Sequence, residues 1–214
     1  MNRTIKEYLT NNFAELNLNS LRGKYNIRFE LGGEKEIGTT ERINQVVNRA
    51  TEIYNQAIGN NEIIISIKEY EADFYDLEIK NQPYLSELIT LENLDRFKGP
   101  FEQTYYETDN SGNRIEQVFE DKIDCDLLIG KITLDKETIS KIIRGKANLE
   151  MGFEPAIPQD INFYSISKRI GFRIYDDRGC DIWSDNKEDL KPIYESLNKW
   201  ILDYNRPEID KYFK

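Results

Sequence analysis

The stretch from Tyr175 to Trp183 brings together the residues of this chain whose types could do chemistry. It reads YDDRGCDIW, and Asp176, Asp177 and Asp181 surround Arg178 within six positions. Carboxylate oxygens are ligands for Mg²⁺ or Ca²⁺, and an arginine can clamp an anion, so the stretch could hold a metal ion or an anionic group. The same residue types also suit a tight turn between two strands, where Asp is favoured at the first position and Gly at the fourth.

A structural turn explains part of this stretch without any ligand. Asp176 would accept backbone N–H bonds, and Gly179 would take the left-handed conformation that closes a hairpin with a G1 bulge. Arg178 would repel a bound cation, and the spacing of the acidic residues differs from that of an EF-hand loop. We therefore favour a turn built on Asp176 and Gly179, and we interpret Asp177, Arg178 and Asp181 as residues that contact a partner. A metal or anion site on the same stretch is the alternative.

The residues that the chain lacks exclude several chemistries. It has 214 residues and no histidine, which excludes Ser-His-Asp and Cys-His nucleophile systems and His-ligated metals. Cys125 and Cys180 lie far apart and outside any CxxC pattern, so we expect free buried thiols rather than a zinc site or a disulfide scaffold. No Walker or Gly-x-Gly-x-x-Gly motif is present. The sequence predicts no catalytic residues, no bound metal and no cofactor.

The charge of the chain favours a protein as its partner. The net charge is −10 and the isoelectric point is about 4.8. An acidic chain repels phosphate backbones, so we do not expect nucleic acid as a ligand, whereas a basic protein is compatible with this charge. Two strands expected at 101–108 and 114–120 offer a surface for such a partner, since tyrosine is a typical interface anchor. Its candidate contact residues are Glu102, Tyr105, Glu107 and Glu116. A solvated sheet face is the simpler interpretation of the same pattern.

Length and composition favour one globular domain over residues 1–214. Hydrophobic residues make up 39% of the chain and aromatic residues 12%, which is sufficient for a core of this size. The N-terminal residues have no apolar signal core, and no segment approaches the ~20 apolar residues of a membrane span. We therefore expect a cytoplasmic protein with no membrane partner.

Hydrophobic periodicity predicts an α+β fold. Helical spacing predicts a long helix from 39 or 40 to 58, a second helix at 135–149, and a final helix from about 185 to 204. Pro192 should either kink this last helix or mark its true start. Strands are expected at 26–31, 62–67, 127–129, 161–166, 172–175 and 180–183. These elements predict a mixed, mainly antiparallel sheet with helices packed on it, and a C-terminal β-hairpin followed by a helix. The order strand, helix, strand over 26–67 would allow one parallel crossover.

Four stretches of the chain resemble one bacterial family. They are IRFELGG at 27–33, NRATEIYN at 48–55, IYDDRGCDIW at 174–183 and LKPIYESLNKWILDYNRPEID at 190–210. In this order and spacing they look like the family known as domain of unknown function 3885, over about residues 25–210. The resemblance implies a cytoplasmic bacterial protein without an established activity. Members of the family are often encoded near secreted polymorphic toxins, among proteins assigned as immunity proteins.

These observations predict a non-enzymatic protein-binding protein. The most concrete form of this hypothesis is an immunity protein that neutralises a cognate basic toxin by covering its active site or substrate groove in a stoichiometric complex. The alternative is a carboxylate- or metal-dependent enzyme, or a regulatory module, that uses the turn from Asp176 to Asp181. A scaffold whose partner is not a toxin is a third hypothesis, and the sequence does not separate it from the first.

Overall fold

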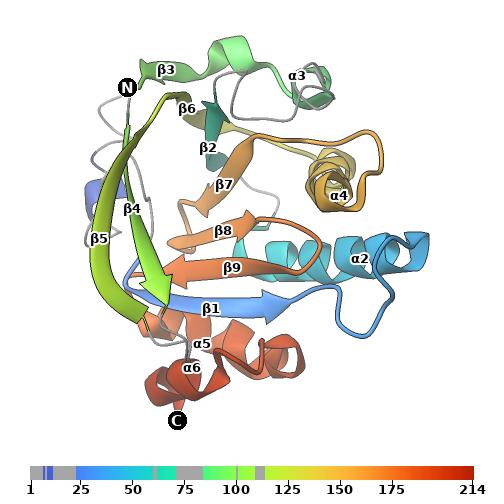
Figure 1. The fold of residues 1–214 in the computed structure, drawn as a ribbon, viewed down its shortest axis with the longest axis vertical. Coiled ribbons are helices and arrows are strands. Elements are labelled where there is room, and N and C mark those ends of the chain that lie inside the picture. The colour runs from blue at the N-terminus through green and yellow to red at the C-terminus, as the bar shows by residue number, and fades with distance from the viewer. Residues whose placement is uncertain are drawn as a thin grey trace.

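Two antiparallel sheets and the helices around the larger one form the described part of the chain (Figure 1). The computed structural model describes residues 7, 9–11, 23–59, 62–70, 84–99, 101–108 and 114–214, and within these it describes no side chains for 101–108 and 114–123. Every strand pairing in the described residues is antiparallel. The expected α+β class is therefore confirmed.

The larger sheet has the strand order β1-β9-β8-β7-β2-β6-β3. The first two strands run in the same direction, because four antiparallel pairings separate them, so the parallel crossover considered for residues 26–67 is present, with β9, β8 and β7 inserted between β1 and β2. The expected C-terminal hairpin is present as β8 and β9, and a helix follows it. The strands are β1 (Tyr25–Glu30), β2 (Ile63–Tyr70), β3 (Asp95–Lys98), β6 (Cys125–Ile132), β7 (Asp160–Ser165), β8 (Ile170–Ile174) and β9 (Gly179–Ser184).

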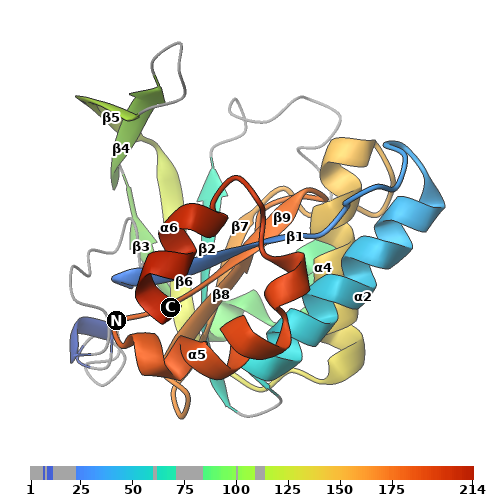
Figure 2. The ribbon, with the colours of Figure 1, turned by 90° about the horizontal axis from the view of Figure 1, so that it is seen from below.

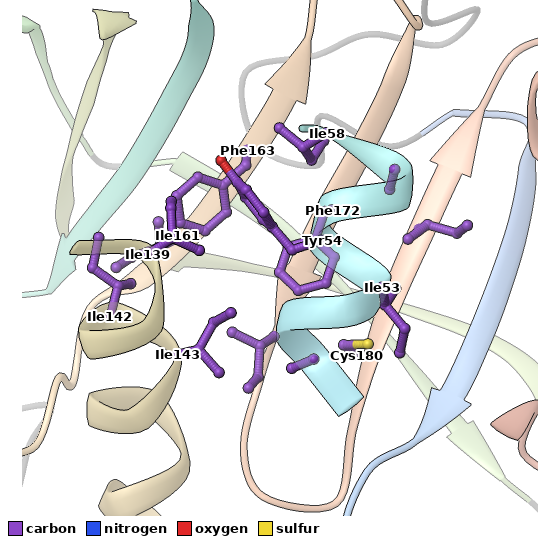
Figure 3. Close-up of a cluster of buried hydrophobic side chains, with 14 of the residues drawn as sticks. Ile53, Tyr54, Ile58, Ile139, Ile142, Ile143, Ile161, Phe163, Phe172 and Cys180 are labelled. Atoms are coloured by element: carbon purple, nitrogen blue, oxygen red, sulfur yellow. The ribbon is translucent and has the colours of Figure 1, made fainter. Parts of the chain in front are cut away.

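Helices α2 (Thr40–Ala57) and α4 (Lys136–Met151) cover one face of this sheet. Both begin at predicted positions, because the side chains of Thr39 and Asp135 accept hydrogen bonds from backbone N–H groups of the first turn. Figure 3 shows the core between the helices and the sheet, where the Tyr54 ring meets Phe163 and Phe172 edge-on at 5.4 and 5.5 Å. The apolar stripes read from the sequence thus face the sheet as expected.

The opposite face of the sheet carries a smaller apolar cluster and a row of charged residues. The cluster contains Leu9, Ile64, Ile129, Tyr164 and Trp183. Residues on a strand alternate between the two faces of a sheet, and the apolar side chains of β1, β8 and β9 in the main core point toward the helices. The intervening positions of these strands lie on the opposite face, next to the small cluster, and most of them are polar. The two faces of the sheet therefore differ in chemistry.

The C-terminal region departs from the predicted continuous helix to residue 204. Helix α5 (Lys187–Ser196) contains Pro192 and ends at the cap Leu197, and a 3-10 turn (Asn198–Trp200) follows. The chain then runs along the free edge of β1, where Leu202 N donates to the Arg28 carbonyl at 3.0 Å. A last helix, α6 (Arg206–Phe213), ends the chain. The helix stops early because these residues cover the edge of β1, which would otherwise expose unpaired backbone groups.

Strands β4 (Phe101–Thr108) and β5 (Arg114–Ile123) form a separate two-stranded sheet. Figures 1 and 2 show this hairpin on the side of the main sheet opposite to α2 and α5. Two short helical segments, α3 (Tyr84–Leu88) and a 3-10 turn (Leu91–Asn93), precede β3. None of the helices in the described residues has the length and apolar character needed to cross a membrane.

Candidate functional site

The three carboxylates of the YDDRGCDIW stretch lie in the protein interior. Strand β8 ends at Ile174 and β9 begins at Gly179, so Asp176 and Asp177 stand on the connection between them, and Asp181 lies inside β9. Asp176, Asp177 and Asp181 are 3%, 2% and 1% exposed. A buried ionised carboxylate is costly unless it is paired, so the partners of these groups decide what the stretch can do.

Asp176 organises the connection itself. Its carboxylate accepts a hydrogen bond from the backbone N–H of Arg178 at 2.7 Å and another from Nε of the same arginine at 2.7 Å. The hydrogen bond to Asp176 raises the pKa of the Arg178 guanidinium. The side chain of Arg178 is 72% exposed. Asp176 thus accepts the local backbone bond that we predicted for a turn residue, and Arg178 stands at the surface.

Asp177 is paired with Arg42 of helix α2. Nε of Arg42 donates to Oδ2 of Asp177, and both side chains are buried. The other end of the guanidinium donates to the Lys35 carbonyl at 2.7 Å. Arg42 follows the N-cap Thr39 by three positions and so stands at the start of its helix. This ion pair therefore joins the β8–β9 connection to α2 and to the loop that precedes α2.

Asp181 is paired with Arg28 across strands β1 and β9. The two residues are register partners, and Nε and one terminal nitrogen of Arg28 donate to the two carboxylate oxygens at 2.8 and 3.1 Å. This hydrogen-bonded pairing raises the pKa of Arg28 even though burial lowers it. The Arg28 guanidinium also lies over the Tyr175 ring, 5.5 Å from its centroid. The partner of Arg28 is thus Asp181 on the neighbouring strand.

A second group of charges lies where β7 begins. Lys146 of α4 is 2% exposed, and its ammonium donates to the Gln159 carbonyl at 2.9 Å. Burial lowers the pKa of Lys146 to about 8. Asp160 accepts a hydrogen bond from the Tyr70 hydroxyl at 2.7 Å and lies 3.5 Å from Arg173. Burial alone would raise the pKa of Asp160, but the charges of Arg173 and Lys146 and the Tyr70 hydrogen bond outweigh it and lower the pKa.

Sequence reasoning missed Lys146 and Arg42, although a signal for each was present. Lys146 follows Ile139, Ile142 and Ile143 at helical spacing, which places it on the apolar stripe of its helix. Arg42 precedes Val46 by four residues and lies on the stripe of α2 in the same way. A charged residue on a predicted buried stripe indicates a buried partner elsewhere in the chain.

The burial of Asp177 and Asp181 corrects two of the predicted contact residues. Both carboxylates face inward and are bound by arginines, so neither can lie in a surface that meets a partner. The pairing also removes the basis for a metal site on this stretch, because a cation would have to displace an arginine from each carboxylate. Within the described residues, no three cysteine or carboxylate side chains are grouped so that they could hold a metal ion.

Gly179 is required for a reason other than the predicted one. Its φ is not among the positive values found in the described residues, so it does not form the left-handed position of a G1 bulge. Instead, a Cβ atom at this position would collide with the Tyr175 hydroxyl and the Phe29 carbonyl. The glycine allows β1 and the Tyr175 ring to approach the first residue of β9 closely.

The other predicted contact residues lie in the β4–β5 hairpin. Glu102 is the register partner of Lys122, Tyr105 of Phe119, and Glu107 of Ile115, with a bulge between Tyr105 and Glu107. Glu116 lies in β5. Their side chains are outside the described part of the structure. The predicted contact residues are thus divided between this hairpin and the segment that runs from the β8–β9 connection into β9.

Neither cysteine is placed to act as a nucleophile. Cys125 and Cys180 are both buried and free, as expected. Burial raises the pKa of each thiol, which disfavours the reactive thiolate. Cys125 lines a polar depression of about 380 Å³ beside Arg96, and that arginine already binds Glu69 at 3.0 Å and Asp126 at 2.6 Å. The depression therefore lacks the unpaired arginine that would favour an anionic ligand.

Comparisons with known proteins give a match to one family model and to one relative, neither of which is described with an activity. Residues 5–205 match the model of a family described as Domain of unknown function (DUF3885). The chain is also similar to the uncharacterized protein YnaE of Bacillus subtilis (strain 168), with 40% identity over 45 residues, which is 21% of this chain and 21% of that protein. The matched segment thus spans about a fifth of that relative. No solved structure matches the chain.

Proposed function

We propose, from the premise that this chain belongs to the family described as Domain of unknown function (DUF3885), that it is a non-enzymatic protein-binding protein. In its most concrete form the proposal is an immunity protein that neutralises a cognate bacterial toxin in a stoichiometric complex. The toxin would be basic, and the complex would form in the cytoplasm. Neither nucleic acid nor a membrane is a ligand in this proposal.

The separate β4–β5 hairpin is the observation that carries the proposal. In the described residues β4 and β5 pair only with each other, so the outer edge of each strand offers backbone groups to a partner. A two-stranded hairpin is marginally stable on its own in water, and contact with a partner would stabilise it. Edge strands of this kind bind partners by strand addition in many protein–protein complexes.

Charge supports a basic partner for this hairpin. The whole chain carries a net charge of −10, and Glu102, Glu107 and Glu116 lie on the two strands. A negative field attracts a positively charged protein and speeds encounter, and salt screens this effect. A toxin that acts on nucleic acid has a basic substrate groove, which an acidic surface would cover.

The internal pairing of the carboxylates supports binding over catalysis. The carboxylates with the best spacing for chemistry, Asp176, Asp177 and Asp181, are each held by an arginine. A general acid or base must reach a substrate, whereas these groups are buried inside ion pairs. They are better suited to fixing the position of the loops around them.

The test is to capture the partner and then to map its contact. The tagged protein is used to isolate proteins from the lysate of its native host, and the purified partner is then titrated with wild-type protein at several salt concentrations. We expect one basic toxin-like protein at 1:1 stoichiometry, with an association rate that falls as salt rises. Failure to capture a partner from cells that express the neighbouring toxin would contradict the proposal.

A charge-matched pair of variants assigns the surface. Glu102→Lys with Glu116→Lys should weaken binding about tenfold or more, chiefly through slower association. The control, Glu195→Lys with Glu208→Lys, makes the same change in net charge at exposed positions of α5 and α6. Equal effects of the two pairs would show that only total charge matters and would remove the hairpin from the interface.

A further inference from the structure

Three segments that are distant in sequence meet at one end of the main sheet. They are the loop from β1 to α2, the β8–β9 connection and the C-terminal end of α4, and they lie at the right of the views in Figures 1 and 2. Leu31 N donates to the Arg178 carbonyl at 2.9 Å, and Gly38 N approaches Sδ of Met151 at 3.0 Å. The three segments therefore form one continuous surface.

The loop between β1 and α2 is held in place although its tip is exposed. Arg42, fixed by Asp177, donates to the Lys35 carbonyl at 2.7 Å. Gln45 donates to the Leu31 carbonyl at 3.2 Å, and the Thr39 hydroxyl donates to the Glu36 carbonyl at 2.7 Å. Each bond ends on a backbone carbonyl, so it fixes the course of the loop and leaves its side chains free to meet another molecule.

This rigid loop presents an apolar side chain to solvent among charged neighbours. Ile37 is 75% exposed, and the only other exposed large hydrophobic residues in the described part of the chain are Tyr204 and Tyr212, which also carry a hydroxyl. A single exposed isoleucine is ordinary on a flexible surface. Here it stands on a loop fixed by a buried ion pair. Exposed residues on the three adjoining segments include Glu34, Lys35, Glu36, Glu150 and Arg178, which with Ile37 we name the tip surface.

Carboxylates dominate the charge of the tip surface. Arg178 is neutralised by Asp176, and Glu34 lies 3.8 Å from Arg49, which leaves Lys35 against Glu36 and Glu150. An apolar anchor inside a polar rim is the arrangement of interface hot spots, and a pre-organised loop loses little entropy on binding. The excess of negative charge selects a positively charged partner and repels a second copy of the same surface.

We propose that the tip surface is the anchor site for a basic partner protein, which receives Ile37 in an apolar pocket and meets Glu34 and Glu36 with lysine or arginine. The inference rests on the proposed function and adds a second contact, at the end of the main sheet and apart from the β4–β5 hairpin. The buried Arg42–Asp177 pair has a role in this arrangement, because it holds the loop in its binding conformation before the partner arrives.

The experiment uses the purified partner obtained as described under the proposed function. Ile37→Asp should weaken its binding about 30-fold or more, mainly through faster dissociation, as for a central anchor. Ile37→Val keeps an apolar anchor and should stay within about threefold of wild type. Glu34→Lys with Glu36→Lys should slow association at low salt and reduce its salt dependence. Tyr204→Asp, at an equally exposed residue outside the tip surface, is the matched control and should bind as wild type does.

The outcomes separate this inference from the proposed function. If Ile37→Asp binds the partner as wild type does, the tip surface is not the anchor, while the proposed function stands. If the free protein forms a concentration-dependent dimer that Ile37→Asp abolishes, the occupant is a second copy and the inference is overturned. If no partner is captured at all, both proposals fail. Thermal melting of each variant controls for folding, and no loss is expected because Ile37 is exposed.

Discussion

Replacing Lys146 by methionine tests whether this lysine is a charge buried at a cost to stability. Lys146 is 2% exposed, and within the described residues its ammonium donates a hydrogen bond to the Gln159 carbonyl. Burial lowers its pKa from 10.5 to about 8. At 1.36 kcal/mol per pKa unit, this difference means that burying the charged lysine lowers the free energy of unfolding by about 3 kcal/mol.

The sign of the pH dependence follows from this lowered pKa. Between pH 8 and 10.5 the unfolded chain keeps a proton on Lys146 that the folded chain has released, so rising pH favours folding through this group. Above 10.5 the lysine is neutral in both states and the cost vanishes. Methionine has no proton to release, so the stability advantage of Lys146→Met over wild type should fall by about 3 kcal/mol between pH 7 and 10.5.

The absolute effect at pH 7 is smaller than this change, because two terms oppose each other. The variant loses the cost of the buried charge but leaves the Gln159 carbonyl without its donor, which costs about 1–3 kcal/mol. We therefore expect Lys146→Met to be as stable as wild type at pH 7 or more stable by up to about 2 kcal/mol. The more direct measure is how the difference in unfolding free energy between Lys146→Met and wild type changes with pH, since the contributions of the other titrating groups cancel in that difference.

The assay is urea unfolding at a series of pH values, followed by the fluorescence of the buried Trp183. The control is Lys141→Met, at an exposed lysine on the same helix that pairs with Glu137. The Glu137 partner raises the pKa of Lys141, so the stability that this pair gives the wild type is lost only as pH rises above 10.5. The difference between Lys141→Met and wild type should therefore stay nearly constant from pH 7 to 10.5. A difference between Lys146→Met and wild type that stays constant from pH 7 to 10.5 would refute the burial argument.

Three further predictions concern the paired charges and the close approach at β9. Asp177→Ala leaves the Arg42 charge buried without its partner and should destabilise the fold by about 3–5 kcal/mol in urea unfolding, and Arg42→Leu in the same chain should recover part of that loss. Gly179→Ala should cost about 1–3 kcal/mol despite an ordinary φ, and Tyr175→Phe should relieve part of the clash. Asp160→Asn should flatten the acid side of the stability profile, because the lowered pKa of Asp160 gives stability that is lost as pH falls through that pKa.

Each of these predictions has an outcome that contradicts it. An additive double variant at Arg42 and Asp177 would mean that the two side chains do not interact. If Gly179→Ala is as stable as the wild type, β1 can move away from the added methyl group at little cost in free energy. If the stability of Asp160→Asn falls with decreasing pH as steeply as that of the wild type, Arg173 and Tyr70 do not favour the ionised carboxylate. Asp203→Asn, at an exposed carboxylate, is the control for the last measurement.

The sequence predicted most of the elements because local periodicity determines which side of an element is apolar. The stripe of α2 and the buried run of β2 are found where expected, and β4 has the predicted bounds. The prediction failed for the helix after Pro192, where residues 198–202 leave the helix to cover β1. That choice depends on the edge of a strand far away in sequence, which no local pattern contains.

By itself, the sequence determined the class of the fold, the absence of histidine chemistry and the presence of a turn near residues 176–179. Only the tertiary structure decided which arginine meets each aspartate: Arg42 lies 135 residues from Asp177, and Arg28 lies 153 residues from Asp181. The strand order places β1 beside β9 and the start of α2 beside the β8–β9 connection. Spacing along the chain fixes the face on which a charge lies, but its partner is set by packing between distant segments, since a buried charge is stable only where the fold supplies its counterpart.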